Sequence, residues 1–211
     1  MAGEIETIRD LCVRGKRAEL IQAVDGALAA GMSAQEIMAQ GLIPAMSIVG
    51  EKYSSGEFFL PQMMIAARAM QEAMAALKPR LVAEAYETKA KAVLGTVAGD
   101  FHDIGKNIVK IMLEGAGYEV VDLGIDAGPE KFVEAVRSHA PQFVLMSALL
   151  TLTMESMRKT VQALDAAGVR GKVVIGVGGA PLTQKFAEEI GADFYGEDAY
   201  RCVELCNASL R

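Results

Sequence analysis

The chain has 211 residues, long enough for one large domain or two small ones, and its 52% hydrophobic and 23% charged residues are typical of an ordinary globular protein. The formal net charge of −6 argues against a protein that neutralises nucleic-acid phosphates, which needs a basic surface. No apolar span approaches the roughly 18 residues of a membrane helix and the N-terminus lacks signal-peptide features, so we expect a cytoplasmic protein without nucleic-acid or membrane partners.

Residues 1–88 are predicted to form an all-α four-helix bundle. Apolar residues recur at spacings of three and four, which is the pattern of one buried helix face. Ser33 followed by Glu36 has the form of a capping box, and Pro61 suits the first turn of a helix, where its missing N–H is not needed. Pro44 should strain the third helix. The polar, lysine-bearing segment 86–90 is the expected linker and hinge.

Residues 89–211 change to short aliphatic runs that alternate with amphipathic stretches. Such alternation predicts an α/β domain with a doubly wound, five-stranded parallel sheet, because a parallel pair needs a helical crossover. Ligands of such sheets bind beyond the carboxyl ends of the strands. The predicted strands are 92–97, 119–123, 143–147, 172–176 and 193–195, and the predicted helices are 105–116, 129–139, 154–167, 183–190 and 198–209.

The segment 95–109 follows the first predicted strand and opens the first helix of this domain, which places it at the ligand edge. It lacks both nucleotide-binding glycine motifs, but it offers a single imidazole, His102, with Asp100 two residues earlier. Imidazole binds transition metals well, and a neighbouring carboxylate can hold the proton of the other ring nitrogen. The only other histidine is His139, so a zinc site built from protein ligands is not expected. By chemistry alone, a helix-capping role for His102 is equally acceptable.

Three cysteines in a chain without a secretion signal indicate free thiols in a reducing compartment. Cys202 and Cys206 lie four residues apart on the last predicted helix and share one face, but further metal ligands at a useful spacing are missing.

The pattern Asp100-x-His102-x-x-Gly105 matches the corrinoid-binding motif shared by methionine synthase, cobalamin-dependent mutases and the methyl-carrying corrinoid proteins of anaerobic methyltransferase systems. Ser147-Ala-Leu-Leu-Thr151 resembles the S-x-L segment of that family, and Gly178-Gly179 resembles its paired glycines. The segment 56–62 resembles the helical cap of methyl carriers, so the resemblance covers nearly the whole chain. It implies a helical cap domain over 1–88 and a flavodoxin-like, Rossmann-like cobalamin-binding domain over 89–211.

The resemblance also implies roles for individual residues. His102 would be the lower axial ligand of cobalt in a base-off, His-on corrinoid, Asp100 would accept its other ring proton, and Ser147 would hydrogen-bond Asp100. Glycines at 105, 178 and 179 would leave room for the nucleotide tail of the cofactor. The remaining cofactor-binding residues would be Asp103, Ile104, Leu149 and Thr151 in the second domain, and Phe59 and Met63 in the cap, where Phe59 is expected over the cobalt.

The function implied is that of a methyl-carrier subunit, without catalysis of its own, in one-carbon metabolism. Its partners would be a substrate-specific donor methyltransferase, an acceptor methyltransferase that passes the methyl group to tetrahydrofolate or a thiol, and a reductive activase. A mutase small subunit and a corrinoid-dependent transcriptional sensor are the alternatives. A mutase needs a barrel of about 250 residues, and a sensor needs a DNA-binding module. A phosphate- or flavin-binding protein would leave His102 without a purpose.

Overall fold

The structure is a computed structural model that describes residues 2–84 and 87–210. It contains two units, the first formed by residues 1–88 together with Gly115–Gly117, and the second by residues 89–114 and 118–211. Part of the linker predicted at 86–90 lies outside the described residues. Within the described part of the chain, no helix is long and apolar enough to cross a membrane.

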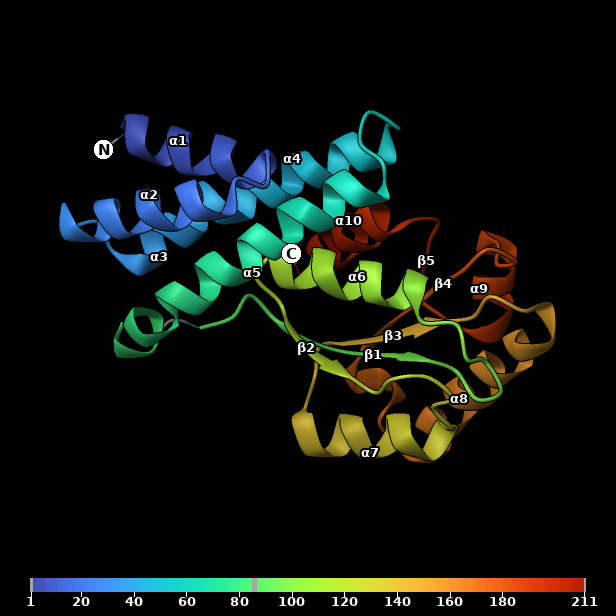
Figure 1. Cartoon of the computed structure of the whole chain (residues 1–211). Coiled ribbons are helices and arrows are strands. Elements are labelled where there is room, and N and C mark those ends of the chain that lie inside the picture. Colours follow the sequence, from blue (N-terminus) through green and yellow to red (C-terminus); the bar gives the residue numbers. More distant parts are fainter. Residues whose placement is uncertain (1, 85–86, 211) are drawn as a thin grey trace. The chain divides into compact units, whose positions relative to one another are not determined.

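The first unit consists of helices throughout, as the apolar spacing predicted. Residues 34–54 form one continuous helix with a π-helical stretch in its middle, so that four helical stretches follow one another along residues 2–83. They are α1 (Ala2–Val13), α2 (Arg17–Ala29), α3 (Ala34–Glu36) with the π-helix Ile37–Leu42 and α4 (Ile43–Ser54), and α5 (Leu60–Ala83) (Figure 1).

Local polar contacts explain where the third of these helices begins and why it is irregular. The hydroxyl of Ser33 accepts a hydrogen bond from the backbone N–H of Glu36 at 3.1 Å, as its capping-box position predicted. Pro44 has no N–H to donate to the carbonyl of Gln40, and this carbonyl instead accepts a hydrogen bond from Arg9 Nη2 at 2.7 Å. The strain expected near Pro44 therefore takes the form of a π-helix with a side-chain donor beside it.

The second unit is a five-stranded, all-parallel sheet with the strand order β2-β1-β3-β4-β5, and the fold class predicted from the alternating pattern is confirmed. Helices α6 and α10 lie on one face, and α7 and α8 lie on the other (Figure 1). The strands are β1 (Lys91–Thr96), β2 (Glu119–Asp122), β3 (Phe143–Ser147), β4 (Val174–Gly178) and β5 (Phe194–Gly196). The helices are α6 (Ile104–Gly115), α7 (Pro129–His139), α8 (Met154–Ala166), α9 (Gln184–Ile190) and α10 (Ala199–Ser209).

The fourth strand lies two residues further along the chain than predicted. Residues Arg170–Lys172 form a 3-10 turn, and pairing with β3 starts only where the N–H of Val174 donates to the carbonyl of Gln142 at 2.8 Å. The β-branched run that suggested a strand from residue 172 does not reveal this turn. The shift matters because it brings Gly178 to the carboxyl end of the strand, opposite Ser147 in β3.

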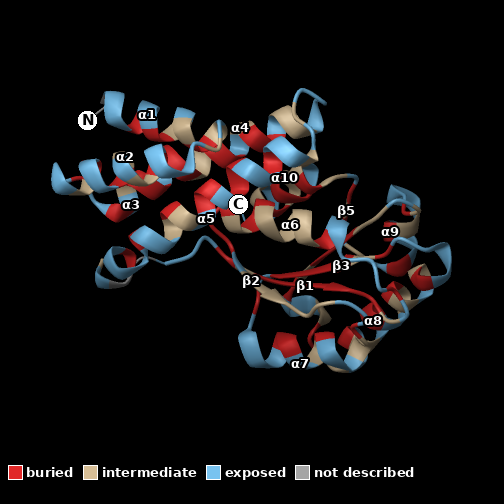
Figure 2. Cartoon of the chain, viewed as in Figure 1, coloured by how far each residue is buried: buried red, intermediate tan, exposed pale blue. Residues whose placement is uncertain are grey.

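The central strands are buried on both faces, as expected for a doubly wound sheet (Figure 2). Side chains of β1, β3 and β4 pack with those of α7, α8 and α9 in one apolar cluster that includes Val93, Phe132, Val144, Met157, Leu164, Ile175 and Ile190. This rigid layer supports the loops at the carboxyl edge of the sheet.

Packing around Gly176 gives a direct test of this core. A Cβ atom at residue 176 would lie 2.3 Å from Phe194 Cζ and 2.8 Å from Leu145 Cδ2. We expect Gly176→Ala to lower the free energy of unfolding by about 1–3 kcal/mol, because the neighbouring ring and methyl group must move. Urea unfolding followed by circular dichroism measures this. Gly171→Ala is the matched control, since a Cβ there meets no atom within 4 Å; an equal loss in both variants would contradict the packing.

Candidate functional site

Strand register brings the separate sequence motifs to one edge of the sheet. Thr96 at the end of β1 lies opposite Ser147 of β3, Ser147 lies opposite Gly178 of β4, and Gly178 lies opposite Gly196 of β5. The loops that follow β1 and β3 therefore start side by side. This is the position where the strand order reverses and where doubly wound sheets bind their ligands.

The carboxylate of Asp100 joins these two loops. One oxygen, Oδ1, accepts hydrogen bonds from the backbone N–H of His102 at 3.0 Å and contacts His102 Nδ1 at 2.7 Å. The other, Oδ2, accepts from the N–H groups of Leu149 at 2.7 Å and Leu150 at 3.2 Å, and lies 2.8 Å from Thr153 Oγ1. The side chain is fully buried. A single buried carboxylate thus fixes the imidazole and cross-links both loops.

The pKa of Asp100 is held well below the usual range for a carboxyl group. Burial acts in the opposite direction and is the largest single influence, but the combined hydrogen bonds from Leu149, His102 and Thr153 outweigh it. Asp100 therefore stays ionised at neutral pH, and the shared proton belongs to the imidazole.

His102 presents one ring nitrogen to its surroundings. Because Nδ1 donates to Asp100, the lone pair lies on Nε2, which has no hydrogen-bond partner among residues 2–84 and 87–210. The side chain is 50% exposed. The main chain around it is fixed as well, since its carbonyl accepts a hydrogen bond from the hydroxyl of the buried Thr96 at 2.9 Å. The arrangement suits a single axial bond to a metal brought by a ligand.

Large apolar side chains around His102 are exposed, which is unusual for a globular surface. Phe101 and Ile104 on either side of the histidine are 67% and 68% exposed. The loop after β3, held by the same carboxylate, adds three more such side chains, those of Leu149, Leu150 and Leu152. Exposed apolar side chains concentrated around one imidazole indicate a ligand or partner surface rather than chance.

Thr153 is the site residue that the sequence did not predict. The notion that Ser147 hydrogen-bonds Asp100 is corrected, because among the described residues the hydroxyl that reaches this carboxylate is that of Thr153. Thr153 Oγ1 is also 2.8 Å from the carbonyl of Leu150, but the charged carboxylate is the stronger acceptor for its one proton. Ser147 is the last residue of β3, whereas Thr153 ends the 3-10 turn Thr151–Thr153 in the loop that follows this strand. The sequence signal that could have identified Thr153 is a hydroxyl residue directly before the predicted helix 154–167.

The three predicted glycines differ in what a side chain at each position would meet. A Cβ at Gly105 meets nothing within 4 Å, which agrees with open space for a ligand beside the first turn of α6. At Gly178 and Gly179, by contrast, a side chain would collide with backbone atoms of the protein. A Cβ at Gly178 would lie 3.0 Å from the carbonyl oxygen of Gly196, and one at Gly179, whose φ is +135°, would lie 1.8 Å from that of Ala148.

The remaining predicted residues are distributed over both units. Asp103 is exposed and accepts a hydrogen bond from Asn107 Nδ2 at 3.1 Å, and Thr151 is exposed at the start of the 3-10 turn. In the first unit, the ring of Phe59 is exposed just before α5, whereas Met63 is fully buried. Phe59 is thus accessible to a ligand without any rearrangement, and Met63 is not.

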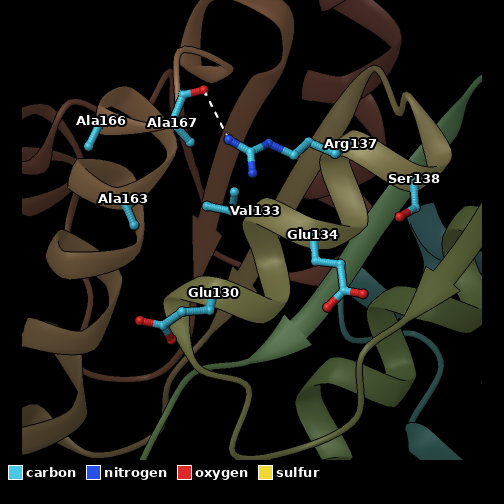
Figure 3. A pocket seen from close by; sticks show the side chains of 8 residues that line it. All are labelled: Glu130, Val133, Glu134, Arg137, Ser138, Ala163, Ala166 and Ala167. Carbon is cyan, nitrogen blue, oxygen red and sulfur yellow. Dashed lines mark hydrogen bonds between the residues drawn. The ribbon is translucent and has the colours of Figure 1, made fainter.

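Two other kinds of site, a metal centre held by protein side chains and a surface groove, have weaker support. No group of three or more His, Cys, Asp or Glu side chains with metal-binding geometry occurs in the part of the chain that the structure describes. A groove of about 640 Å³ lies between α7 and α8, lined by Val133, Arg137, Ala163 and their neighbours (Figure 3). None of its lining residues contacts Asp100 or His102, so it does not belong to the Asp100–His102 site.

The low pKa of Asp100 predicts a pH-dependent loss of stability. In Asp100→Asn, the free energy of unfolding should fall at pH 7. Because the folded pKa lies below the unfolded value of about 3.9, the wild-type advantage is complete above that pH and declines as pH falls below it, by about 1 kcal/mol at pH 3. Urea unfolding at both pH values measures this. The control is Asp103→Asn, expected to change stability by less than about 0.5 kcal/mol. A pH-independent difference would contradict the assignment.

Comparison with known proteins gives one consistent result. The B12 binding domain family matches residues 90–204, and a second family with the same description matches residues 4–78. Trimethylamine corrinoid protein 1 of Methanosarcina acetivorans is 42% identical over 90% of this chain and 88% of that protein. A cobalamin-binding protein from Desulfitobacterium hafniense is 37% identical with a TM-score of 0.81, covering 98% of this chain and 97% of that one.

A chain of the methanol:cobalamin methyltransferase complex MtaBC from Methanosarcina barkeri is 30% identical with a TM-score of 0.86, covering 99% of this chain and 80% of that one. The resemblance that rested on Asp100, His102 and Gly105 is confirmed, and the chain belongs to the corrinoid proteins with B12-binding domains.

Proposed function

We propose that this chain holds a corrinoid in the base-off, His-on state, with His102 as the lower axial ligand, and carries a methyl group between two methyltransferases. The observation that carries the proposal is the buried, ionised Asp100, which binds Nδ1 of His102 and leaves Nε2 free. When bound, the corrinoid supplies the cobalt on which the methyl group travels.

The residues of the site fit such a group. One imidazole is too little for a metal ion held by protein alone, and it suffices where a macrocycle provides the other ligands. The exposed side chains of Phe101, Ile104 and Leu149 offer an apolar surface to a large flat ring, and the open space at Gly105 leaves room beside it. Ser147 and Thr151 would contact the nucleotide tail.

Asp100 and Thr153 give His102 its chemical properties. The ionised carboxylate keeps the proton on Nδ1 and orients the ring, in the way that outer carboxylates support metal-bound histidines. Because the pKa of Asp100 is far below neutrality, the carboxylate stays ionised and would keep hold of the Nδ1 proton while Nε2 faces the corrinoid.

Partners follow from the relatives. One relative is a trimethylamine corrinoid protein, and the MtaBC complex is a methanol:cobalamin methyltransferase, so we propose a donor methyltransferase that acts on a small methylated compound. An acceptor methyltransferase for tetrahydrofolate or a thiol, a reductive activase and a cytoplasmic location complete the proposal. The helical unit would serve as the cap, with Phe59 as its contribution to the ligand.

Reconstitution of His102→Ala tests the axial-ligand assignment. The wild-type chain should bind added cobalamin with the absorption and nitrogen hyperfine signals of the base-off, His-on state. His102→Ala should lose these signals and bind more weakly, by one or two orders of magnitude, as for loss of a metal ligand or its support. His139→Ala removes the other histidine, at the end of α7, and should match the wild type. Wild-type spectra in His102→Ala would overturn the assignment.

A further inference from the structure

The loop that follows β2 holds the His102 segment at its beginning. Asp126 has a positive φ of 50°, a backbone conformation that is strained for a residue with a side chain. In this conformation its N–H donates to the carbonyl of Asp100 at 3.0 Å, and its Oδ1 accepts from the N–H of Gly99 at 2.7 Å. Both the backbone and the side chain of Asp126 thus clasp the turn that places Asp100.

The last residue of β2, Asp122, holds the segment at its end. Lys106, in the first turn of α6, is only 2% exposed, and its Nζ lies 2.8 and 2.9 Å from the two carboxylate oxygens of Asp122. A cation in the first turn of a helix is placed unfavourably with respect to the helix dipole, and a buried lysine is poorly solvated. Lys106 Nζ also donates to Asn107 Oδ1 at 2.7 Å, but Asp122 supplies the countercharge, and the pair fixes the chain directly after Gly105.

Three further hydrogen bonds connect Asp122 to the residue that bears the imidazole. Asp122 Oδ1 accepts a hydrogen bond from the N–H of Gly124 at 2.9 Å, and the carbonyl of Gly124 accepts one from the N–H of Thr96, also at 2.9 Å. The hydroxyl of Thr96 in turn donates to the carbonyl of His102. His102 is thereby linked through partly buried hydrogen bonds to the loop after β2.

These contacts matter because residues 101–105 are all exposed, so side-chain packing does not hold this segment in place. We propose that Asp126 and the Lys106–Asp122 pair, together called the clasp, are positioning residues. They hold the segment from Gly99 to Lys106 in the shape that presents His102 Nε2 before a corrinoid arrives. The inference rests on the proposed function for its purpose, while the contacts themselves are all made within the chain. Such pre-organisation reduces the ordering that ligand binding requires.

Hydrogen–deuterium exchange on the ligand-free, full-length chain tests the clasp without any cofactor. Lys106→Met and Asp126→Ala should raise exchange of amides in residues 99–106 by roughly tenfold or more, because local opening becomes easier. Exchange in β4 should stay unchanged. Lys110→Met is the matched control, since Lys110 also contacts Asp122, at 3.3 Å, but lies one turn further along α6. Unchanged exchange in both clasp variants would overturn the proposal.

Conservative variants separate positioning from general stabilisation. Asp126→Asn retains an acceptor for Gly99 and tolerates a positive φ, and Lys106→Arg retains the charge, so each should restore slow exchange at least in part. If Lys106→Met fails to fold by circular dichroism, Asp126→Ala, a change at an exposed residue, still decides the question. If Asp126→Ala exchanges as slowly as Asp126→Asn and the wild type, at an unchanged melting temperature, the side-chain oxygen that accepts from Gly99 has no positioning role.

Reconstitution with cobalamin then tests the purpose of the clasp. At saturating cobalamin, the His-on fraction, measured by the nitrogen hyperfine signal, should fall severalfold in Asp126→Ala and Lys106→Met and remain at the wild-type level in Lys110→Met. Absence of a His-on signal in the wild type would overturn the proposed function but leave the exchange result standing. A full His-on signal in variants whose segment exchanges rapidly would overturn the positioning role alone.

Discussion

The ionised carboxylate of Asp100 is the interaction on which the site depends. Buried without exposure, it is stable only because hydrogen bonds from His102, Leu149, Leu150 and Thr153 replace its hydration. Those donors come from the loops after β1 and β3, which the parallel register places side by side. Removing the charge would leave several donors unsatisfied at once, so the site is an all-or-none arrangement and not a set of independent contacts.

Polar and apolar side chains have different roles in this site. The side chains of Thr96, Asp100 and Lys106 are buried and hydrogen-bonded, whereas those of Phe101 and Ile104 are apolar and exposed. A loop that shows apolar groups to water gains nothing from local packing, so its shape must come from hydrogen bonds below it. The positive φ of Asp126 is local strain that these hydrogen bonds maintain at a binding site.

Much of the fold follows from sequence periodicity. The alternation of aliphatic runs and amphipathic stretches gave the order of strands and helices in the second unit, and β3 and α7 have the predicted bounds. The error at β4 arose because the β-branched run 172–176 fits a strand, while the 3-10 turn at Arg170–Lys172 depends on how the chain reaches its partner strand. Pairing partners and register depend on distant parts of the chain, so residue propensities cannot give the exact residues at which a strand begins and ends.

The sequence by itself determined that a lone histidine, preceded by a carboxylate, lies at the ligand edge of a parallel sheet, because strand order and loop position follow from local patterns and topology rules. Only the tertiary structure decided which hydroxyl completes the site, since Thr153 and Asp100 are 53 residues apart and meet through a turn that Ser147 does not share. The same holds for Gly179, whose constraint is the carbonyl of Ala148, and for Lys106 and Asp122. Contacts between distant segments depend on the packed backbone, and no local pattern encodes them.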